Sequence, residues 1–480
     1  MRLFKHLTHS SITDDKKKLG MISGLASTLT VAAFSLGLIL STSKVIDANI
    51  QKGHSKVVYL TLAVHTGEKD TWDRLAEKFR QTPGNENISL KINVFHKDFK
   101  GEAKKSDLVY TDIIWLPEFV ESGIIMPINT NLIQKFGVST VDELVTKGGF
   151  LETEIEHGKY QPPDKPKQLY RIPFRTDMGV LYYRKDLLTK YAKSVPHNYN
   201  ELIKIAKEIQ NSHRTKYGYL WQGTGEGAAT MFLEVLHGHG GFWVKDRETD
   251  INKKVGLADP EAIDAIKFLR KTLHEKISNR DFNETYTDKY FMEGEAVFLR
   301  SWVNVWNKVQ DNSESPVKGK IEIMPMVANI SDAWTSCQGG WGLALSKKLE
   351  GDSARIDAAM RAIVSLTSAD SQKQFALKQG TLPTIKYLFY DKDITWKYPH
   401  YEKLYKDFIH KKKLVPRPRT VKYEKLSNIL RKTLNLVLDL NKDNVTVTQI
   451  MKDSAELTRN CLRERNPKSS CEKQGKLVKL

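Results

Sequence analysis

Short apolar runs bounded by turn or charged residues recur along the chain, and they predict buried strands. The clearest run is 178–183 (MGVLYY), which ends at the charged residues Arg184, Lys185 and Asp186. Runs of this length between such signals are typical of strands rather than helices. Apolar runs over 57–64 and 90–95 predict two more strands nearer the N-terminus.

Between the two early strands the apolar residues take up the spacing of a helix. Trp72, Leu75, Ala76 and Phe79 recur at i, i+3, i+4 and i+7, so they share one buried helix face. A strand, a helix and a second strand in this order predict a parallel sheet. We therefore expect an α/β fold.

Two segments in the middle of the chain have contrasting patterns. The segment 195–210 predicts a helix in which Asn198 is the N-cap, because Glu201 follows it three residues later as in a capping box. The segment 141–169 is polar and contains Pro162, Pro163 and Pro166. We expect this second segment to be a long surface loop.

Three carboxylates lie where the predicted strands begin or end. Glu68 is in the loop beyond the first strand, Asp112 ends a strand within 106–128, and Asp177 directly precedes the strand 178–183. Ligands of α/β sheets bind beyond the carboxyl ends of strands, which makes Glu68 and Asp112 candidate ligand groups. From position alone, the better interpretation of Glu68 is a solvated loop carboxylate, and that of Asp177 is a capping or hinge carboxylate.

The N-terminus has the pattern of an export signal. Residues 1–18 are basic, with a cluster at Lys16, Lys17 and Lys18, and residues 19–40 carry no charge. A basic leader before an apolar segment predicts export of the remainder, and the segment is about long enough to span a bilayer. No cysteine follows it, which excludes a lipoprotein anchor. Residues 19–41 are thus a cleaved signal peptide or an uncleaved membrane anchor, with a linker over 42–56.

Charge alone would allow an anionic partner. Lysine and arginine number 75 against 57 aspartates and glutamates, a formal net charge of +18 over 480 residues. Such a surplus is found in proteins that bind nucleic acid or anionic membranes. Here the basic residues are spread along the whole chain without a nucleic-acid-binding motif. We expect a lysine-rich solvated surface and no nucleic-acid partner.

The chain has three cysteines. Cys461 and Cys471 lie close together in the basic tail 461–480, where oxidising conditions outside the cytoplasm would let them form a disulfide, leaving Cys337 single. Three unrelated free thiols are the alternative. There is no cluster of cysteine and histidine at zinc-binding spacing, so we expect no metal site.

Several motifs, in one consistent order, resemble those of the family 1 extracellular solute-binding proteins, the ligand-capturing subunits of ABC sugar importers. The nearest resemblance is to trehalose- and maltose-binding proteins. The motifs are SDLVYTDIIWLPEFVESGIIMPI (106–128), IPFRTDMGVLYYRKDLL (172–188), VPHNYNELIKIAKEIQ (195–210), YGYLWQGTGEGAATMFLEVLHGHGGFW (217–243), YFMEGEAVFLRSWVNVW (290–306), CQGGWGLALS (337–346) and VPRPRTVKY (415–423).

The resemblance covers about 57–460 and implies the two-lobed clamshell of the type II periplasmic binding proteins, with a ligand cleft between the lobes. Lobe 1 would comprise 57–178 and 342–395, and lobe 2 would comprise 179–341 and 396–460. The chain departs from the family pattern at Met126, Arg175 and Gln338.

By the same resemblance, residues from both lobes would bind the ligand. Trp302 would be a stacking platform, while Trp306 and Trp115 would mainly pack. Trp221, Gln222 and Glu226 would border the cleft. The implied ligand-binding set is Glu68, Asp112, Asp177, Trp302, Gly340, Trp341 and Arg417.

The function implied is capture of a sugar, an α-linked disaccharide, by hinge closure and its delivery to the transmembrane subunits of an ABC permease. Sugar rings stack on tryptophans, and their hydroxyls pair with carboxylates and arginine. We expect no cofactor, no catalysis, and a periplasmic or cell-surface location, with membrane contact through 19–41 if that helix is retained. The alternatives are a membrane-anchored sugar sensor and a glycoside hydrolase, which also uses paired carboxylates. Trehalose, maltose and sucrose fit the pattern equally.

Overall fold

The computed structural model describes residues 57–95, 99–245, 254–330 and 335–464. The chain divides into a unit over Met1–Val57 and a second unit over Val58–Leu480. The predicted basic leader, apolar helix and linker over 1–56 lie outside the described residues, as does Cys471, so these predictions and the disulfide stay predictions. In the part of the chain that is described, no helix is long and apolar enough to cross a bilayer.

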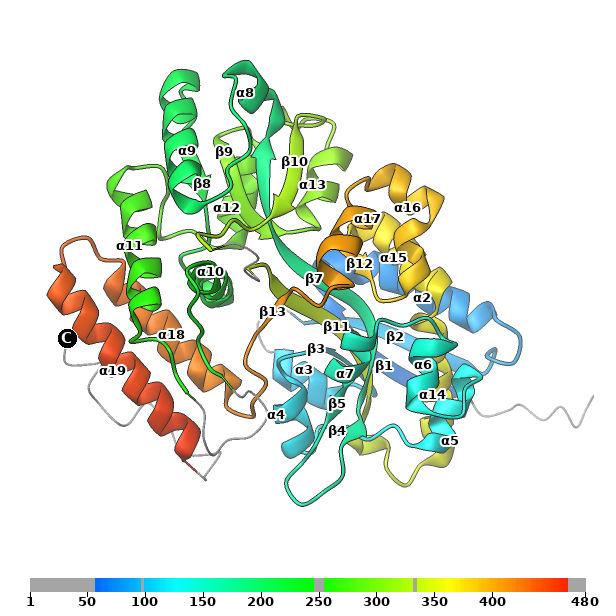
Figure 1. Cartoon of the computed structure of the whole chain (residues 1–480). Helices are drawn as coiled ribbons and strands as arrows, with labels where there is room; N and C mark the ends of the chain where they lie inside the picture. Colours follow the sequence, from blue (N-terminus) through cyan, green and yellow to red (C-terminus); the bar gives the residue numbers. More distant parts are fainter. Residues whose placement is uncertain (1–56, 96–98, 246–253, 331–334, 465–480) are drawn as a thin grey trace, which may run out of the picture. The chain divides into compact units, whose positions relative to one another are not determined.

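The second unit is an α/β structure organised around an 11-stranded sheet, whose main strand order is β2-β1-β3-β11-β7-β9-β8 (Figure 1). Two short strands, β5 and β6, pair separately. The strands are β1 Val58–His65, β2 Ile88–Phe95, β3 Leu108–Asp112, β4 Ile125–Met126, β5 Lys159–Tyr160, β6 Gln168–Leu169, β7 Arg171–Arg184, β8 Tyr217–Leu220, β9 Ala296–Trp302, β10 Ile321–Pro325, β11 Cys337–Ser346, β12 Leu382–Pro383 and β13 Val415–Pro416.

The first part of the sheet is parallel, as the sequence predicts. β1 pairs in parallel with β2 and with β3. Helix α2 (Lys69–Gln81) connects β1 to β2 and buries Trp72, Leu75 and Phe79 on one face. The carboxyl ends of β1 and β3 therefore lie at the same edge of the sheet, where Glu68 follows β1 and Asp112 ends β3.

Strand β7 joins the two parts of the sheet. Its first half, from Arg171 to Met178, pairs with β11, and its second half, from Gly179 onward, pairs with β9 and β10. Figure 1 shows β7 running between the group that contains β1 to β3 and the group that contains β8 to β10. The predicted strand start at residue 178 is wrong: Asp177 lies inside one continuous strand, where it pairs with Gly339 of β11.

Helices cover both parts of the sheet. The capping prediction for α9 (Tyr199–His213) is confirmed, since the Asn198 side chain accepts a hydrogen bond from the backbone N–H of Glu201. The remaining α-helices are α3 Phe99–Lys105, α4 Leu116–Glu121, α5 Thr130–Ile133, α6 Val141–Thr146, α7 Glu152–Gly158, α8 Lys185–Lys190, α10 Gly225–Gly238, α11 Pro260–His274, α12 Glu284–Met292, α13 Val305–Asp311, α14 Ser353–Leu366, α15 Ala369–Gln379, α16 Lys392–Lys397, α17 Tyr401–Leu404, α18 Tyr423–Val437 and α19 Asn444–Arg463.

The prediction of a surface loop over 141–169 is wrong. Helices α6 and α7 and strands β5 and β6 occupy most of this segment. Leu144 and Ile155 are buried, and the Thr140 side chain caps α6. The three prolines lie only in the turn between β5 and β6, so their signal does not extend to the helical residues before them.

Candidate functional site

A cavity of about 790 Å³ lies among the strand and helix ends beside β7 and β11. We call it the charged cavity, because its lining includes five carboxylates and three cationic side chains. Its lining residues are His65, Gly67, Glu68, Asp112, Arg175, Asp177, Thr224, Gly225, Glu226, Gly227, Thr230, Asn283, Glu284, Thr285, Trp302, Asn304, Lys308, Gly339, Trp341, Gln379, Thr381 and Arg417.

Arg175 holds two of these carboxylates. Arg175 and Asp177 are two positions apart on β7, so their side chains leave the same face of the strand. The Arg175 guanidinium donates to Asp177, and its Nη2 lies 3.3 Å from Oε1 of Glu68. Its Nε donates to the Tyr110 hydroxyl at 2.8 Å. Burial raises the pKa of Asp177 to about 6, although the neighbouring guanidinium opposes this change.

Arg417 holds a third carboxylate. Its Nη2 lies 2.9 and 2.8 Å from the two carboxylate oxygens of Asp112, at the carboxyl end of β3. Both side chains are buried, with 4% of Arg417 and 7% of Asp112 exposed. Nε of Arg417 has no hydrogen-bond partner among the described residues. One guanidinium donor of Arg417 is therefore unpartnered and enclosed by protein atoms.

The other two carboxylates lie in the first turns of two helices. Glu226, in α10, accepts a hydrogen bond from the Ser427 hydroxyl at 2.5 Å and another from the Tyr423 hydroxyl. Glu284, in α12, accepts one from the indole N–H of Trp302 at 2.8 Å. Burial raises the pKa of Glu284. Acidic groups are favourable at helix N-termini, where the backbone N–H groups point outward.

The two tryptophans of the cavity have different surroundings. The Trp341 ring packs among aromatic rings, with centroids 4.5 Å from His65 and 4.8 Å from Tyr110. Trp302 is half-buried at the end of β9 and is held at its indole nitrogen by Glu284. The indole of Trp306 is buried, packs edge-on against His400 and does not line the cavity. Trp302 is thus the better placed of these rings to stack on a ligand.

The structure brings six of the seven predicted ligand residues to this cavity, and Gly340 is the exception. Its neighbour Gly339 lines the cavity instead. A Cβ on Gly339 would lie 3.0 Å from the Cβ of Asp177, whereas one on Gly340 would meet the Glu154 carboxylate, also at 3.0 Å. Of the residues expected at its border, Glu226 is present, while Trp221 and Gln222 are fully buried elsewhere. A role for these residues in ligand binding stays a prediction.

Sequence reasoning missed several lining residues. His65 ends β1, so the strand-end argument that found Glu68 could also have found it. Burial lowers the pKa of His65, which favours the neutral imidazole. Glu284 and Lys308 come from α12 and α13. Nothing in their local sequence distinguishes them from solvated helix residues.

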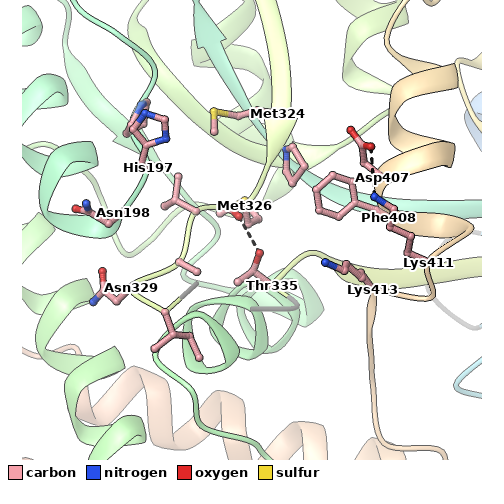
Figure 2. Close-up of a pocket in the computed structure, with 15 residues that line it drawn as sticks. His197, Asn198, Met324, Met326, Asn329, Thr335, Asp407, Phe408, Lys411 and Lys413 are labelled. Atoms are coloured by element: carbon pink, nitrogen blue, oxygen red, sulfur yellow. Dashed lines mark hydrogen bonds and ion pairs between the residues drawn. The ribbon is translucent and has the colours of Figure 1, made fainter. Parts of the chain in front are cut away.

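A second cavity, of about 610 Å³, has a different lining (Figure 2). We call it the methionine cavity; it is lined by Pro196, His197, Asn198, Met324, Pro325, Met326, Val327, Ala328, Asn329, Ile330, Thr335, Asp407, Phe408, Lys411 and Lys413. Its single carboxylate, on Asp407, lies 3.8 Å from Nζ of Lys411. The backbone N–H of Asn329 donates to the carbonyl of Gly238, the last residue of α10. The two cavities therefore lie at opposite ends of α10, about 20 Å apart by helix rise.

A metal centre is not indicated. Among the described residues, no group of three or more histidine, cysteine, aspartate or glutamate side chains could hold a metal ion. Cys337 is a buried free thiol, and burial raises its pKa to about 12.

Sequence and structure comparisons identify the family. The family model described as bacterial extracellular solute-binding protein matches residues 65–373. A probable ABC transporter-binding protein of Deinococcus radiodurans is 29% identical over 282 residues, which cover 56% of this chain and 64% of that protein. The match thus spans less than two thirds of the relative's length.

Comparison with solved structures supports the same family. Maltose-bound T. maritima MalE3 is 26% identical, with a TM-score of 0.71 over 83% of this chain and 99% of that one. The GacH receptor of Streptomyces glaucescens shares the fold, at 20% identity and a TM-score of 0.70 over 85% of this chain and 99% of that receptor. The chain belongs to the bacterial extracellular solute-binding proteins and has their two-lobed α/β fold.

Proposed function

We propose that this protein captures a sugar, an α-linked disaccharide, in the charged cavity and delivers it to the transmembrane subunits of an ABC permease. The observation that carries the proposal is the convergence of carboxylates, arginines and Trp302 on one cavity. Its volume of about 790 Å³ lies within the usual range for small-molecule sites, about 300–1,000 Å³.

The chemistry of the lining suits a sugar. Hydroxyl groups donate to carboxylates such as Glu68 and Asp177 and accept from arginine N–H groups such as those of Arg175 and Arg417. The apolar face of a pyranose ring stacks on an indole such as that of Trp302. The maltose bound in T. maritima MalE3 supports an α-linked disaccharide as the first candidate.

Hinge closure is the proposed motion. Strand β7 passes between the two groups of strands, β11 pairs with its first half, and the cavity lies beside both strands. A ligand shifts a clamshell toward its closed state only to the extent that it binds that state more tightly. Buried carboxylates give such a difference. Closure removes them from water, which costs free energy unless the ligand supplies hydrogen bonds in place of water.

A sugar screen tests the proposal. We expect a disaccharide such as maltose or trehalose to raise the melting temperature and to bind in isothermal titration, and chromatography should recover the sugar unchanged. Hydrolysed product would support the glycoside hydrolase instead. Loss of sugar uptake on deletion of the gene would support transport, whereas normal uptake with a lost sugar response would support a sensor.

Export and anchoring are proposed together. The family is extracellular, and we propose a periplasmic or cell-surface location with 19–41 acting as a signal peptide or a membrane anchor. N-terminal sequencing of protein from the envelope fraction distinguishes the two forms. Intact protein confined to the cytosolic fraction would contradict the proposal.

A further inference from the structure

A fully buried ion pair lies behind Trp302. Arg300 and Trp302 are two positions apart on β9, so their side chains share one face of the strand. The guanidinium carbon of Arg300 lies 4.8 Å from the centroid of the Trp302 ring. Arg300 donates to Glu234 of α10 through two hydrogen bonds of 2.6 and 2.9 Å, and neither side chain is exposed to solvent.

The same pair lies against β7 and β11. Glu234 Oε1 accepts the backbone N–H of Cys337, the first residue of β11, at 2.9 Å. On β7, Gly179 pairs directly with Trp302. A Cβ at Gly179 would lie 1.8 Å from Glu234 Oε1 and 2.9 Å from Arg300 Nη2. Only glycine therefore leaves room for the pair at this point.

Stability alone does not explain such a pair. Burying two charges carries a desolvation penalty, and replacing a buried pair by apolar residues of similar volume is often neutral or stabilising. A geometric role is the better explanation, because the planar guanidinium fixes its position through the two-pronged bond to Glu234 and a third bond to Gln222. A fixed plane behind an indole limits how that ring can tilt.

We infer that Arg300 and Glu234 are positioning residues that set the orientation of the Trp302 ring and tie it to β7 and β11. Glu284 holds the indole nitrogen and Arg300 holds one ring face, so the ring has two independent restraints. The consequence for affinity rests on the proposed function, whereas the orientation of the ring does not.

The test is the variant Arg300→Lys, in which the positive charge remains but the planar fork is lost. The full chain is labelled with 5-fluorotryptophan, and the Trp302 resonance is assigned by its absence in Trp302→Phe. We expect this resonance to shift or broaden in the unliganded variant. We also expect maltose or trehalose to bind about threefold to tenfold more weakly, while circular dichroism stays that of the wild-type protein.

Arg270→Lys is the matched control. Arg270 is also buried, and its guanidinium donates to the carbonyls of Val437, Asp439 and Lys442, none of which lines the charged cavity. This variant should lose stability and leave the Trp302 resonance and sugar affinity unchanged. If Arg300→Lys does not fold, the double variant Glu234→Met with Arg300→Met removes the pair at similar volume and should show the same displaced resonance.

An unchanged Trp302 resonance in the Arg300 variants, or an equal change in Arg270→Lys, would overturn the inference. If neither maltose nor trehalose binds the wild-type protein, the proposed ligand is wrong. The resonance of the unliganded protein still decides the positioning role in that case.

Discussion

The two cavities at the ends of α10 are similar in size and opposite in chemistry. The charged cavity, about 790 Å³, is lined by five carboxylates, three cationic side chains and two tryptophans, whereas the methionine cavity, about 610 Å³, is lined largely by apolar side chains and has one carboxylate. Volume does not distinguish them. The distinguishing feature is the set of buried polar groups in the charged cavity, since such groups remain only where neighbours or a ligand pair with them.

The largest expected effect comes from Asp112→Ala. Removing this carboxylate leaves the buried Arg417 without its partner, so we expect a loss of about 2–3 kcal/mol in the free energy of unfolding and a tenfold to hundredfold weaker sugar affinity, about 1.5–3 kcal/mol. Chemical denaturation and isothermal titration measure the two quantities.

Asp407→Ala is the matched change in the methionine cavity. Asp407 forms half-exposed ion pairs with Lys403 and Lys411, so stability should change by no more than about 0.5 kcal/mol and affinity should not change. If Asp112→Ala binds the sugar with wild-type affinity, the charged cavity is not the ligand site.

Trp302→Ala should act mainly on affinity. The substitution removes the stacking face, and we expect binding weaker by about 1.5–3 kcal/mol in titration. Phe408→Ala, which removes an aromatic ring from the methionine cavity, should leave affinity at the wild-type value. If Phe408→Ala weakens sugar binding as much as Trp302→Ala does, sugar binding is not restricted to the charged cavity.

One pH effect on stability should arise from Asp177 in the charged cavity. In the folded protein Asp177 has a pKa of about 6, above its ordinary value. As pH rises, the folded state therefore keeps the Asp177 proton to a higher pH than the unfolded chain does. The stabilising contribution of Asp177 is therefore present at low pH and lost as pH rises through about 6. Between pH 5 and 7 it should fall by about 1 kcal/mol.

Unfolding free energies of the wild-type protein and Asp177→Asn across this pH window measure the effect. The variant should lack the Asp177 component of the slope. Parallel curves for the two proteins would mean that Asp177 titrates at its ordinary pKa in the folded state.

The smallest effect is expected from Met326→Leu. Met326 is buried at the methionine cavity, and leucine has nearly the same volume, so stability should change by less than about 1 kcal/mol and affinity should be constant. Thermal melts and titration check this. A marked loss of affinity would show that the methionine cavity is coupled to the ligand site through α10.

The parts that the sequence predicts well depend on local signals. The strand-helix-strand opening, the α9 cap and the positions of Glu68 and Asp112 at strand ends follow from spacing and residue type alone. The convergence of Trp302 and Arg417 with these residues came from the family resemblance, because no local signal places residues 190 to 349 positions apart in one cavity.

The errors have physical causes. The predicted strand begins at residue 178, but pairing of Asp177 with Gly339 of β11 and of Gly179 with Trp302 of β9 continues one strand from Arg171 to Arg184. The prolines near residue 163 mark a turn only, while Leu144 and Ile155 are buried in a hydrophobic cluster that includes residues from distant segments. Glu284 was missed for the same reason, since its burial depends on Trp302, 18 positions away.

The continuity of β7 affects how the second unit unfolds. The strand supplies hydrogen bonds to both parts of the sheet, so neither lobe has a complete sheet without the residues that it shares with the other. A protease or a gene truncation would find no linker between Arg171 and Arg184 at which to separate them. Calorimetry should accordingly record one cooperative unfolding transition for both lobes rather than two.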